Sequence, residues 1–323
     1  MQRTFSVVKF KGPLREKNLI TSVTSNRTTF LTGIFLCLAG AILFSTKAII
    51  VKMAYRDTQV DAVTLLALRM LFSLPFFLAS AWATSSQKNN KRFTTIQWMQ
   101  IMLVGVLGYY VSSLLDFLGL QYVSANIERL ILFIYPTIVL LITATWLKEK
   151  ISRMQWIALC ITYTGLLLAF CGDSLAFTHQ QNFVLGASLI FGCTITYALY
   201  IVGSGQLIPR VGAAKFNSYA MTFACAAVLL HYTLQKQQNL FTLSAEVYQY
   251  SLVMALVSTV VPSFLISAGI KRVGADNAAI VGTIGPVSTI IQAHFLLGEG
   301  ISVLQILGAI LILVGVLLIG KKS

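Results

Sequence analysis

Residues 119–170 align with residues 269–320 without a gap, so the chain contains an internal repeat with an offset of 150 residues. The basic residues do not follow this repeat. Lys148 and Lys150 correspond to glycines in the second copy, whereas Lys271 and Arg272 correspond to Gln and Tyr in the first. Because basic loops stay on the cytoplasmic side of a membrane, the two copies are predicted to cross the membrane in opposite directions. The conserved pairs of the repeat include Gly119 with Gly269, Ala125 with Ala275, Pro136 with Pro286, Glu149 with Glu299, Ser152 with Ser302, and Gln155 with Gln305.

The composition agrees with a membrane location. Apolar residues make up 57% of the sequence and charged residues only 11%, whereas a soluble domain carries about a quarter charged residues. Apolar runs of about 20 residues, the length that a helix needs to cross a bilayer, recur along the chain. We predict ten spans, at about residues 30–54, 62–83, 96–119, 124–147, 152–171, 183–203, 216–234, 248–269, 275–297 and 301–320.

The predicted fold is therefore an all-α integral membrane protein with ten transmembrane helices, arranged as two inverted five-helix repeats over residues 30–171 and 183–320. Residues 1–29 are polar and basic, and we predict that they form a mobile tail. The first span is too long for the apolar core of a signal peptide, so it is expected to be retained as a helix. Inverted repeats of membrane helices are typical of secondary transporters.

The distribution of basic residues predicts that both termini are cytoplasmic. With the amino terminus inside, 18 of the 24 Lys and Arg residues fall in the cytoplasmic tail, loops and carboxyl terminus. The opposite side then holds Arg56 and Lys236, with Lys52 near the end of the first span. This bias satisfies the positive-inside rule, and it requires an even number of spans.

Several function classes are excluded by the sequence. The net charge of +14 does not indicate nucleic-acid binding, because the basic residues lie in short loops between apolar spans. The five cysteines form no CxxC pair, so neither a metal site nor a disulfide is expected. No HExxH, GxSxG or Walker-type motif is present. We therefore predict no enzyme activity, no cofactor and no ATP binding, and a gradient or the solute itself must supply the energy.

Six ionisable residues inside predicted spans are candidates for a functional role, because each costs about 3 kcal/mol at a helix centre. With the predicted topology, all six fall in the outer half of the membrane. One interpretation is that they reach the outer surface, and the other is that they line a cavity or pair internally. The second is favoured for the two deepest, Lys47 and Arg69. The six residues are Lys47, Arg69, Asp116, Glu128, Arg129 and His294.

Pairing hypotheses follow from these positions. Side chains of neighbouring helical residues point apart, so Glu128 and Arg129 are not expected to pair with each other. Lys47 with Asp116, and Arg69 with Glu128, are the proposed pairs. Three basic residues against two acidic ones leave a positive surplus, which favours an anionic solute or a zwitterion with a carboxylate. If protons are the coupling ion, the titratable candidates are Glu128, Asp116 and His294.

Pro136 and Pro286 interrupt the fourth and ninth spans at equivalent positions. A proline in mid-helix removes a backbone hydrogen bond and kinks the helix. Matched interruptions in two transporter halves indicate a central binding site. Aromatic residues precede Pro136, and glycines, including Gly285, precede Pro286. The fourth span is therefore expected to supply aromatic side chains to the site, and the ninth span the space for them. The alternative is that both prolines only shape helix packing. Tyrosines deep in the third and sixth spans, Tyr109 and Tyr200 among them, can contact a solute or bond neighbouring helices.

Over about residues 30–320 the chain resembles the drug/metabolite transporter superfamily and, within it, the EamA-type exporters. The resemblance rests on the ten short helices in two halves, a small-residue face before Lys47 and Ala67-Leu68-Arg69 in the second helix. Leu147-Lys148-Glu149 and Leu297-Gly298-Glu299 resemble the family's recurrent helix ending. The resemblance implies a basket of helices around a central cavity, lined by helices one, three, four, six, eight and nine. It suggests Lys47, Tyr109, Tyr135 and Tyr200 as lining residues and a structural role for Arg69.

The functional hypothesis is a gradient-driven permease of the inner (plasma) membrane. It exports amino acids or related small polar metabolites by alternating access about a site near Pro136 and Pro286. Alternatives are a multidrug or organic-cation exporter and a non-transporting membrane sensor or scaffold. An intramembrane enzyme is a further rival, but it would need clustered His and acidic residues, and the three histidines are scattered. The expected partners are a small-molecule solute and the lipid bilayer, and the oligomeric state is left open.

Overall fold

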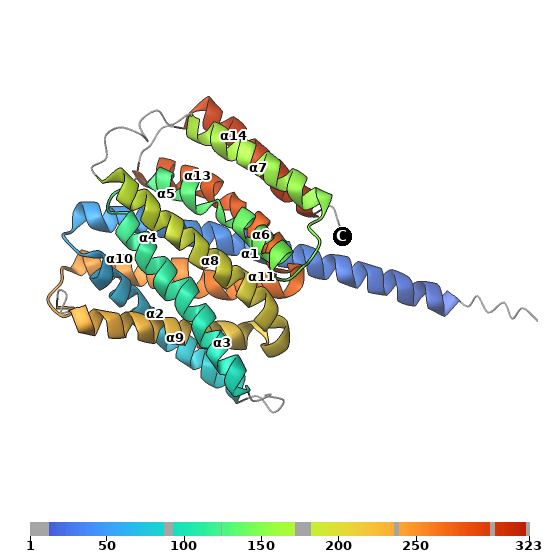
Figure 1. Cartoon of the computed structure of the whole chain (residues 1–323), viewed down its shortest axis with the longest axis horizontal. Helices are drawn as coiled ribbons and strands as arrows, with labels where there is room; N and C mark the ends of the chain where they lie inside the picture. The colour runs from blue at the N-terminus through green and yellow to red at the C-terminus, as the bar shows by residue number, and fades with distance from the viewer. Residues whose placement is uncertain are drawn as a thin grey trace, which may run out of the picture.

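A computed structural model describes residues 13–86, 93–123, 125–171, 182–235, 239–297 and 301–320. Every regular element in these ranges is helical (Figure 1). The elements are α1 (Pro13–Asp57), α2 (Ala62–Ser85), α3 (Thr95–Gly105), η1 (Val106–Val111), α4 (Ser112–Gly119), α5 (Ala125–Leu132), α6 (Tyr135–Thr145), α7 (Arg153–Cys171), α8 (Phe183–Val211), α9 (Ala213–Gln235), α10 (Ala245–Ala255), η2 (Leu256–Val260), α11 (Val261–Val273), α12 (Ala275–Val281), η3 (Gly282–Ile284), α13 (Gly285–Leu297) and α14 (Val303–Gly320).

Close glycine contacts show that the two halves pack in the same way. Gly33 of α1 lies so close to Val273 of α11 that an added Cβ would approach its side chain to 2.6 Å. In the other half, Gly186 of α8 lies against Val123, just after α4, where the corresponding distance is 2.8 Å. Val123 and Val273 are paired by the 150-residue repeat. Thus α1 packs on α11 as α8 packs on α4, as two inverted repeats require.

Local irregularities also recur at equivalent positions. The third span contains a π-helical turn, η1, and the eighth span contains another, η2, 150 residues later. Ser152 and Gln155 form reciprocal hydrogen bonds at the start of α7, the backbone N–H of each donating to the other's side chain. Ser302 and Gln305 do the same at the start of α14. Such capping boxes satisfy backbone donors that a helix start would otherwise leave unpaired.

Helices α7 and α14 pack side by side at one edge of the bundle (Figure 1). Gly165 and Gly308 allow this approach, because a Cβ on either would lie within 2.6 Å of the other's carbonyl oxygen. Among the described residues, eight helices are long and apolar enough to cross a membrane, and Val303–Leu318 in α14 is a shorter apolar helix. The predicted count of ten membrane crossings therefore stays a prediction.

The first helix begins earlier than the sequence predicted. Its residues 13–29 were expected to belong to a mobile tail, yet α1 runs without a break from Pro13 to Asp57. Pro13 occupies the first turn, where a missing N–H is tolerated. No further proline, and no glycine before Gly33, interrupts the helix. The rest of the predicted tail, residues 1–12, lies outside the described residues.

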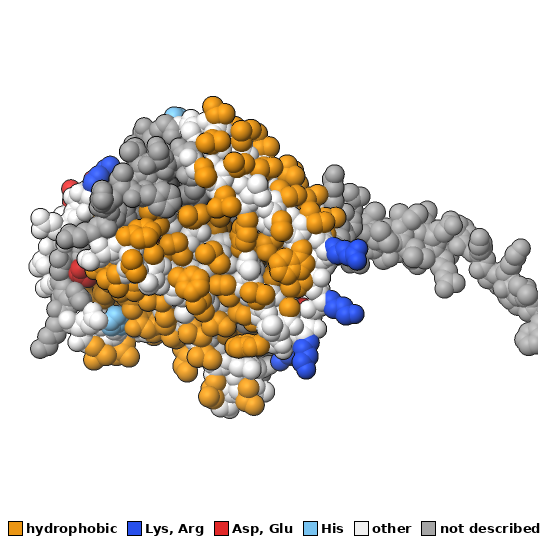
Figure 2. Space-filling view, turned by 45° about the horizontal axis from the view of Figure 1, so that its top comes forward, with side chains coloured by type: hydrophobic (Ala, Val, Ile, Leu, Met, Phe, Trp, Pro, Cys, Tyr) orange, Lys and Arg blue, Asp and Glu red, His pale blue; other side chains and the backbone are white. Residues whose placement is uncertain are grey.

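The surface combines an apolar face with a basic end. Hydrophobic side chains cover most of the visible face in Figure 2, and most of the visible Lys and Arg side chains lie at its right-hand end. This is the end at which α1 extends beyond the bundle in Figure 1. Helices α6, α8 and α11 finish at this end (Figure 1). Their last turns or following loops carry the exposed residues Lys148, Arg210 and Arg272. An apolar face of this kind is suited to lipid.

The glycine contact between α7 and α14 predicts a stability effect. Gly165→Ala would force the two backbones apart, because the added carbon would lie 2.6 Å from the Gly308 oxygen. Overpacking of this kind costs about 1–3 kcal/mol, so the midpoint of thermal unfolding in detergent should fall by several degrees. The matched control is Gly192→Ala, whose added carbon meets only the end of the Leu115 side chain, at 3.2 Å. Equal midpoints for the two variants would contradict the contact.

Candidate functional site

The fourth and ninth spans are each broken near their middle. In the fourth span α5 ends at Leu132 and α6 begins at Tyr135, directly before Pro136. In the ninth span η3 separates α12 from α13, which begins directly before Pro286. Proline has no N–H to continue the helical ladder. The matched prolines therefore break the two helices at equivalent positions, as the sequence predicted.

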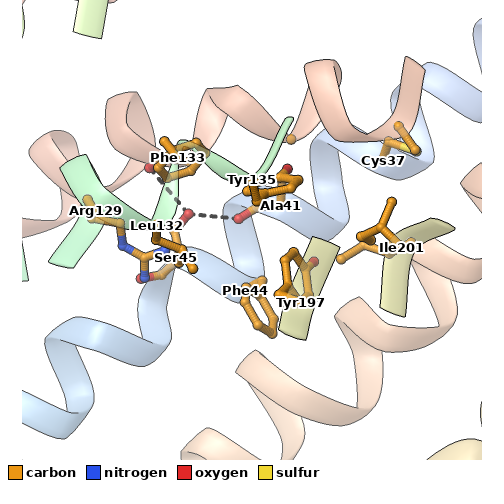
Figure 3. Close-up of a pocket in the computed structure, with 14 residues that line it drawn as sticks. Cys37, Ala41, Phe44, Ser45, Arg129, Leu132, Phe133, Tyr135, Tyr197 and Ile201 are labelled. Atoms are coloured by element: carbon orange, nitrogen blue, oxygen red, sulfur yellow. Dashed lines mark hydrogen bonds between the residues drawn. The ribbon is translucent and has the colours of Figure 1, made fainter. Parts of the chain in front are cut away.

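A pocket with an empty volume of about 480 Å³, including the part of it that is open to solvent, lies between these breaks. Helices α1 and α8 supply its other walls, with Ile266 from α11. Figure 3 shows Arg129 and Ser45 near one end of the pocket and Cys37 near the other. Arg129 is the charged side chain among the described lining residues, which are Cys37, Ala41, Phe44, Ser45, Arg129, Leu132, Phe133, Tyr135, Tyr197, Ile201, Ile266, Ala278, Gly282 and Gly285.

Four aromatic rings form a continuous wall of the pocket. Tyr197 stacks on Phe44 with ring centroids 6.0 Å apart and meets Tyr135 edge-on at 5.1 Å. Phe133 lies 5.9 Å from Tyr135. The aromatic contacts continue beyond the pocket, since Tyr197 also stacks on Tyr200 at 6.0 Å. Ring pairs of this kind favour one fixed arrangement, so the pocket has a shaped apolar wall.

Glycines of the ninth span make room for the aromatic residues of the fourth. A Cβ on Gly282 would lie 2.0 Å from the Tyr135 hydroxyl, and one on Gly285 would lie 2.4 Å from the Phe133 ring. The Tyr135 hydroxyl donates to the Ala279 carbonyl at 2.9 Å. The prediction that one break supplies rings and the other supplies room is confirmed by this geometry.

Next to the pocket lies a buried ion cluster, which comprises Lys47, Asp116, Glu128 and Arg129. The Lys47 ammonium is 2.6 Å from Asp116 and 3.9 Å from Glu128. The Arg129 guanidinium is 3.1 Å from Glu128 and also donates to the Ser45 carbonyl at 2.9 Å. All four side chains are at most 3% exposed. Burying a charge costs several kcal/mol unless an opposite charge compensates for it, and here two basic and two acidic groups balance.

The structure confirms one predicted ion pair and corrects two expectations. Lys47 pairs with Asp116 as predicted. Glu128 and Arg129 do form a pair, although neighbouring side chains leave a helix in different directions. The Arg129 Nε nevertheless lies 3.1 Å from a Glu128 carboxylate oxygen, and both side chains are buried. The proposed pair of Arg69 with Glu128 is wrong, because the Arg69 Nε donates to the Thr259 hydroxyl at 2.6 Å.

Arg69 is fully buried on α2, outside the pocket. Its guanidinium lies over the Phe117 ring, 5.5 Å from the ring centre. Thr259, its hydrogen-bond partner, belongs to the π-helical turn η2. Arg69 thus joins α2 to η2 and α4, as a packing residue would.

The other predicted site residues fall into two groups. Tyr135 and Gly285 line the pocket. Pro286 lines a smaller cavity beside Phe133 and Tyr163. Among the rest, Tyr109 and Tyr200 contact each other edge-on at 5.0 Å, and His294 is exposed on α13 beside Phe295. The predicted cavity residues that do not line the pocket are Lys47, Tyr109, Pro136, Tyr200 and Pro286.

Sequence reasoning did not select Phe44, Ser45, Phe133 and Tyr197 as cavity residues. Ser45 donates to the carbonyls of Ala41 and Gly285, and so ties α1 to the break of the ninth span (Figure 3). The available signal was proximity to the matched prolines, since Phe133 lies three residues before Pro136. Tyr197 belongs to the tyrosines deep in the sixth span, for which a solute contact was one of two interpretations. For Phe44 no local signal exists, because an aromatic residue in a span usually faces lipid or a helix neighbour.

The geometry defines a polytopic membrane protein with two inverted halves and a central pocket between broken helices. The family model for the EamA-like transporter family matches residues 31–171 and 184–321. The chain belongs to this family. Its two matched segments coincide with the two structural repeats.

Several relatives are named as transporters. The uncharacterized transporter YcbK of Bacillus subtilis (strain 168) is 34% identical over 85% of this chain and 88% of its own length. An uncharacterized inner membrane transporter, YicL of Salmonella typhimurium, is 23% identical over 90% and 96%. A solved crystal structure with 15% identity has a TM-score of 0.67 and covers 91% of this chain and 96% of its own, which shows the shared fold. Family and relatives indicate a membrane transporter rather than an enzyme.

The buried pair of Lys47 and Asp116 predicts an unequal effect of single and double substitutions. Asp116→Leu alone leaves a buried ammonium with too little negative charge, which destabilises a protein by about 3–5 kcal/mol. Lys47→Met with Asp116→Leu removes both charges and should recover most of the thermal midpoint. Asp57→Asn, in the exposed pair with Arg56, is the control and should change little. A double variant as unstable as Asp116→Leu would show that the pair is not the source of the loss.

The fit between Gly282 and Tyr135 predicts a rescue. Gly282→Ala collides with the Tyr135 hydroxyl at 2.0 Å, whereas the ring carbon that bears the hydroxyl is 3.4 Å away. Tyr135→Phe removes the hydroxyl and should therefore restore the thermal midpoint that Gly282→Ala lowers. Tyr135→Phe alone loses one hydrogen bond, worth about 1 kcal/mol. If the double variant shows the sum of the two single losses, the two residues do not meet.

Proposed function

We propose that this protein is a secondary, non-ATP permease that exports amino acids or related small polar metabolites by alternating access. The solute binds in the pocket, with its carboxylate at Arg129. The observation that carries the proposal is the position of Arg129, a charged residue in the wall of an otherwise apolar and aromatic pocket. A planar guanidinium pairs well with a carboxylate.

Arg129 is held in a fixed orientation by its contacts. Glu128 lies 3.1 Å from its Nε, and the Ser45 carbonyl accepts from a terminal nitrogen at 2.9 Å. The ion cluster as a whole is balanced, so a bound carboxylate competes with Glu128 for Arg129. This competition keeps the affinity for the solute moderate, as release on the other side of the membrane requires.

The aromatic wall gives the second candidate function some support. Phe44, Phe133, Tyr135 and Tyr197 offer faces to a flat organic cation, which aromatic rings attract. Arg129 repels such a cation in the same pocket. The carboxylate-bearing solute therefore remains the first proposal, and the multidrug or organic-cation exporter remains the alternative.

The proposed movement is a rocking of the two halves about the breaks at Pro136 and Pro286. Energy comes from a gradient, with protons as the candidate coupling ion. Asp116 and Glu128 are the candidate carriers because they are buried beside the pocket, whereas His294 is exposed on α13. Equal transport by liposomes with and without a pH gradient would exclude proton coupling.

The proposed orientation places both termini in the cytoplasm of a cell whose inner (plasma) membrane holds the protein. Its support is the gathering of basic side chains at one end of the bundle (Figure 2). Exposed Lys148, Arg210 and Arg272 lie at the ends of three helices that finish there. The positive-inside rule assigns such an end to the cytoplasm.

Variants of Arg129 and Lys47 test which of these two basic residues binds the carboxylate of the solute. A thermal-shift screen of the purified protein against amino acids, nucleobases, carboxylates and cationic drugs identifies a stabilising ligand, because a ligand raises native-state stability by mass action. The double variant Glu128→Gln, Arg129→Gln keeps the cluster balanced and should abolish stabilisation by a carboxylate-bearing solute.

Lys47→Met with Asp116→Leu is the matched control, since it also removes one balanced pair but leaves the pocket wall intact. It should retain most of the ligand-induced shift. Loss of the shift only in this control would transfer the solute contact from Arg129 to Lys47. Stabilisation by cations alone would favour the organic-cation exporter.

A further inference from the structure

The pseudo-two-fold symmetry assigns a counterpart to each residue of the site. Between the third and eighth spans, and between the fourth and ninth, the offset is 150 residues. Between α1 and α8 it is 153, because Gly33 and Gly186 make the equivalent contacts with Val273 and Val123. The same offset relates Phe44 to Tyr197, and the two rings stack on each other, as residues near the symmetry axis would.

These offsets relate the acidic residues of the ion cluster to residues that line the pocket. Asp116 corresponds to Ile266 and Glu128 corresponds to Ala278, and both counterparts line the pocket. Conversely, Ala41 of the pocket wall corresponds to Thr194, which is fully buried. The ion cluster and the pocket therefore occupy positions that the pseudo-symmetry relates. In the first half this position is filled by paired charged side chains, and in the second half it is an open pocket.

The two places lie at different depths along α1. Cys37, Ala41, Phe44 and Ser45 line the pocket on the side of the basic end, and Lys47 of the cluster follows them toward the opposite end. Inverted repeats reach their two access states by exchanging conformations around a central site. In the opposite-facing state, a cavity therefore opens at the position that the ion cluster fills in the present structure.

The basic members of the cluster have counterparts outside the pocket. Lys47 corresponds to Tyr200 and Arg129 to Ala279, and neither counterpart lines the pocket. By the same exchange, the opposite-facing cavity exposes Asp116 and Glu128, while Lys47 and Arg129 lie outside its lining. The present pocket carries a positive group, and its counterpart would carry two negative ones.

We infer that the opposite-facing state of this protein opens an acidic cavity, lined by Asp116, Glu128 and Thr194, that binds the ammonium group of the transported solute. The inference rests on the proposed alternating access, and it deepens that proposal by naming the second binding site. A zwitterion then meets Arg129 from one side of the membrane and the two carboxylates from the other. The two sites favour opposite ends of the same solute.

Cysteine labelling in proteoliposomes tests the exposure. Ala41→Cys and Thr194→Cys are introduced separately into full-length protein whose native cysteines are replaced by serine or alanine, since Cys37 itself lines the pocket. A membrane-impermeant methanethiosulfonate is added to one side at a time. The two positions are expected to react from opposite sides. Ile195→Cys, on the outer surface of α8 and 38% exposed, faces lipid and should react from neither.

Reagents of opposite charge test the acidic character. Thr194→Cys should react at least about tenfold faster with a cationic than with an anionic methanethiosulfonate, relative to the same ratio at Ala41→Cys, because charges a few ångströms apart interact by more than 1 kcal/mol. The ratio cancels the reactivity of the thiol itself. Adding Asp116→Asn and Glu128→Gln should remove the cationic preference at Thr194→Cys and should create none at Ala41→Cys, whose pocket keeps the positive Arg129.

Three results would overturn the inference: reaction of both positions from the same side, no reaction of Thr194→Cys while Ala41→Cys reacts, or equal rates with both reagents. If Thr194→Cys does not yield a monodisperse protein, Ile190→Cys, the counterpart of Cys37, replaces it with the same expectations. Labelling needs no substrate. Labelling from opposite sides without amino-acid transport would therefore refute the proposed substrate and retain the acidic cavity, whereas transport with same-side labelling would do the reverse.

Discussion

A charge inside a membrane protein is tolerated only beside a partner, and this constraint determines how the first half is closed. Lys47, Asp116, Glu128 and Arg129 come from three helices, yet they meet in one buried cluster. Their mutual attraction holds α1, α4 and α5 together beside the pocket. Arg129 belongs both to this cluster and to the pocket wall, so any change in its pairing acts on both places at once.

The pocket depends on backbone chemistry as much as on side chains. Proline breaks the fourth and ninth spans at equivalent points, and the two breaks face each other. Two symmetric breaks would carry the same residues, but here Phe133 and Tyr135 of the fourth span contact glycines of the ninth span. Because the aromatic rings fit against glycines, they pack between the two breaks and still leave the pocket open. The same asymmetry places charge in one half and an apolar cavity in the equivalent place of the other.

Much of the architecture could be predicted because membrane helices are encoded locally. Apolar length predicts a span, and the loss of basic residues from one copy of the repeat predicts its inversion. The matched prolines located the breaks for the same reason, since a proline acts on its own helix. The pair of Lys47 with Asp116 was also proposed, because both are ionisable residues in the predicted outer half of the membrane and carry opposite charges. The predicted pair of Arg69 with Glu128 failed, because depth alone does not say which helices are neighbours.

The sequence by itself therefore determined the repeat, its inversion, the apolar segments and the points at which two of them break, all of which follow from local composition and spacing. Only the tertiary structure decided which buried side chain faces the pocket. Arg129 does and Lys47 does not, although both are buried basic residues of one ion cluster. The rotation of each helix about its axis makes this choice, and that rotation is set by packing against helices far away in the sequence.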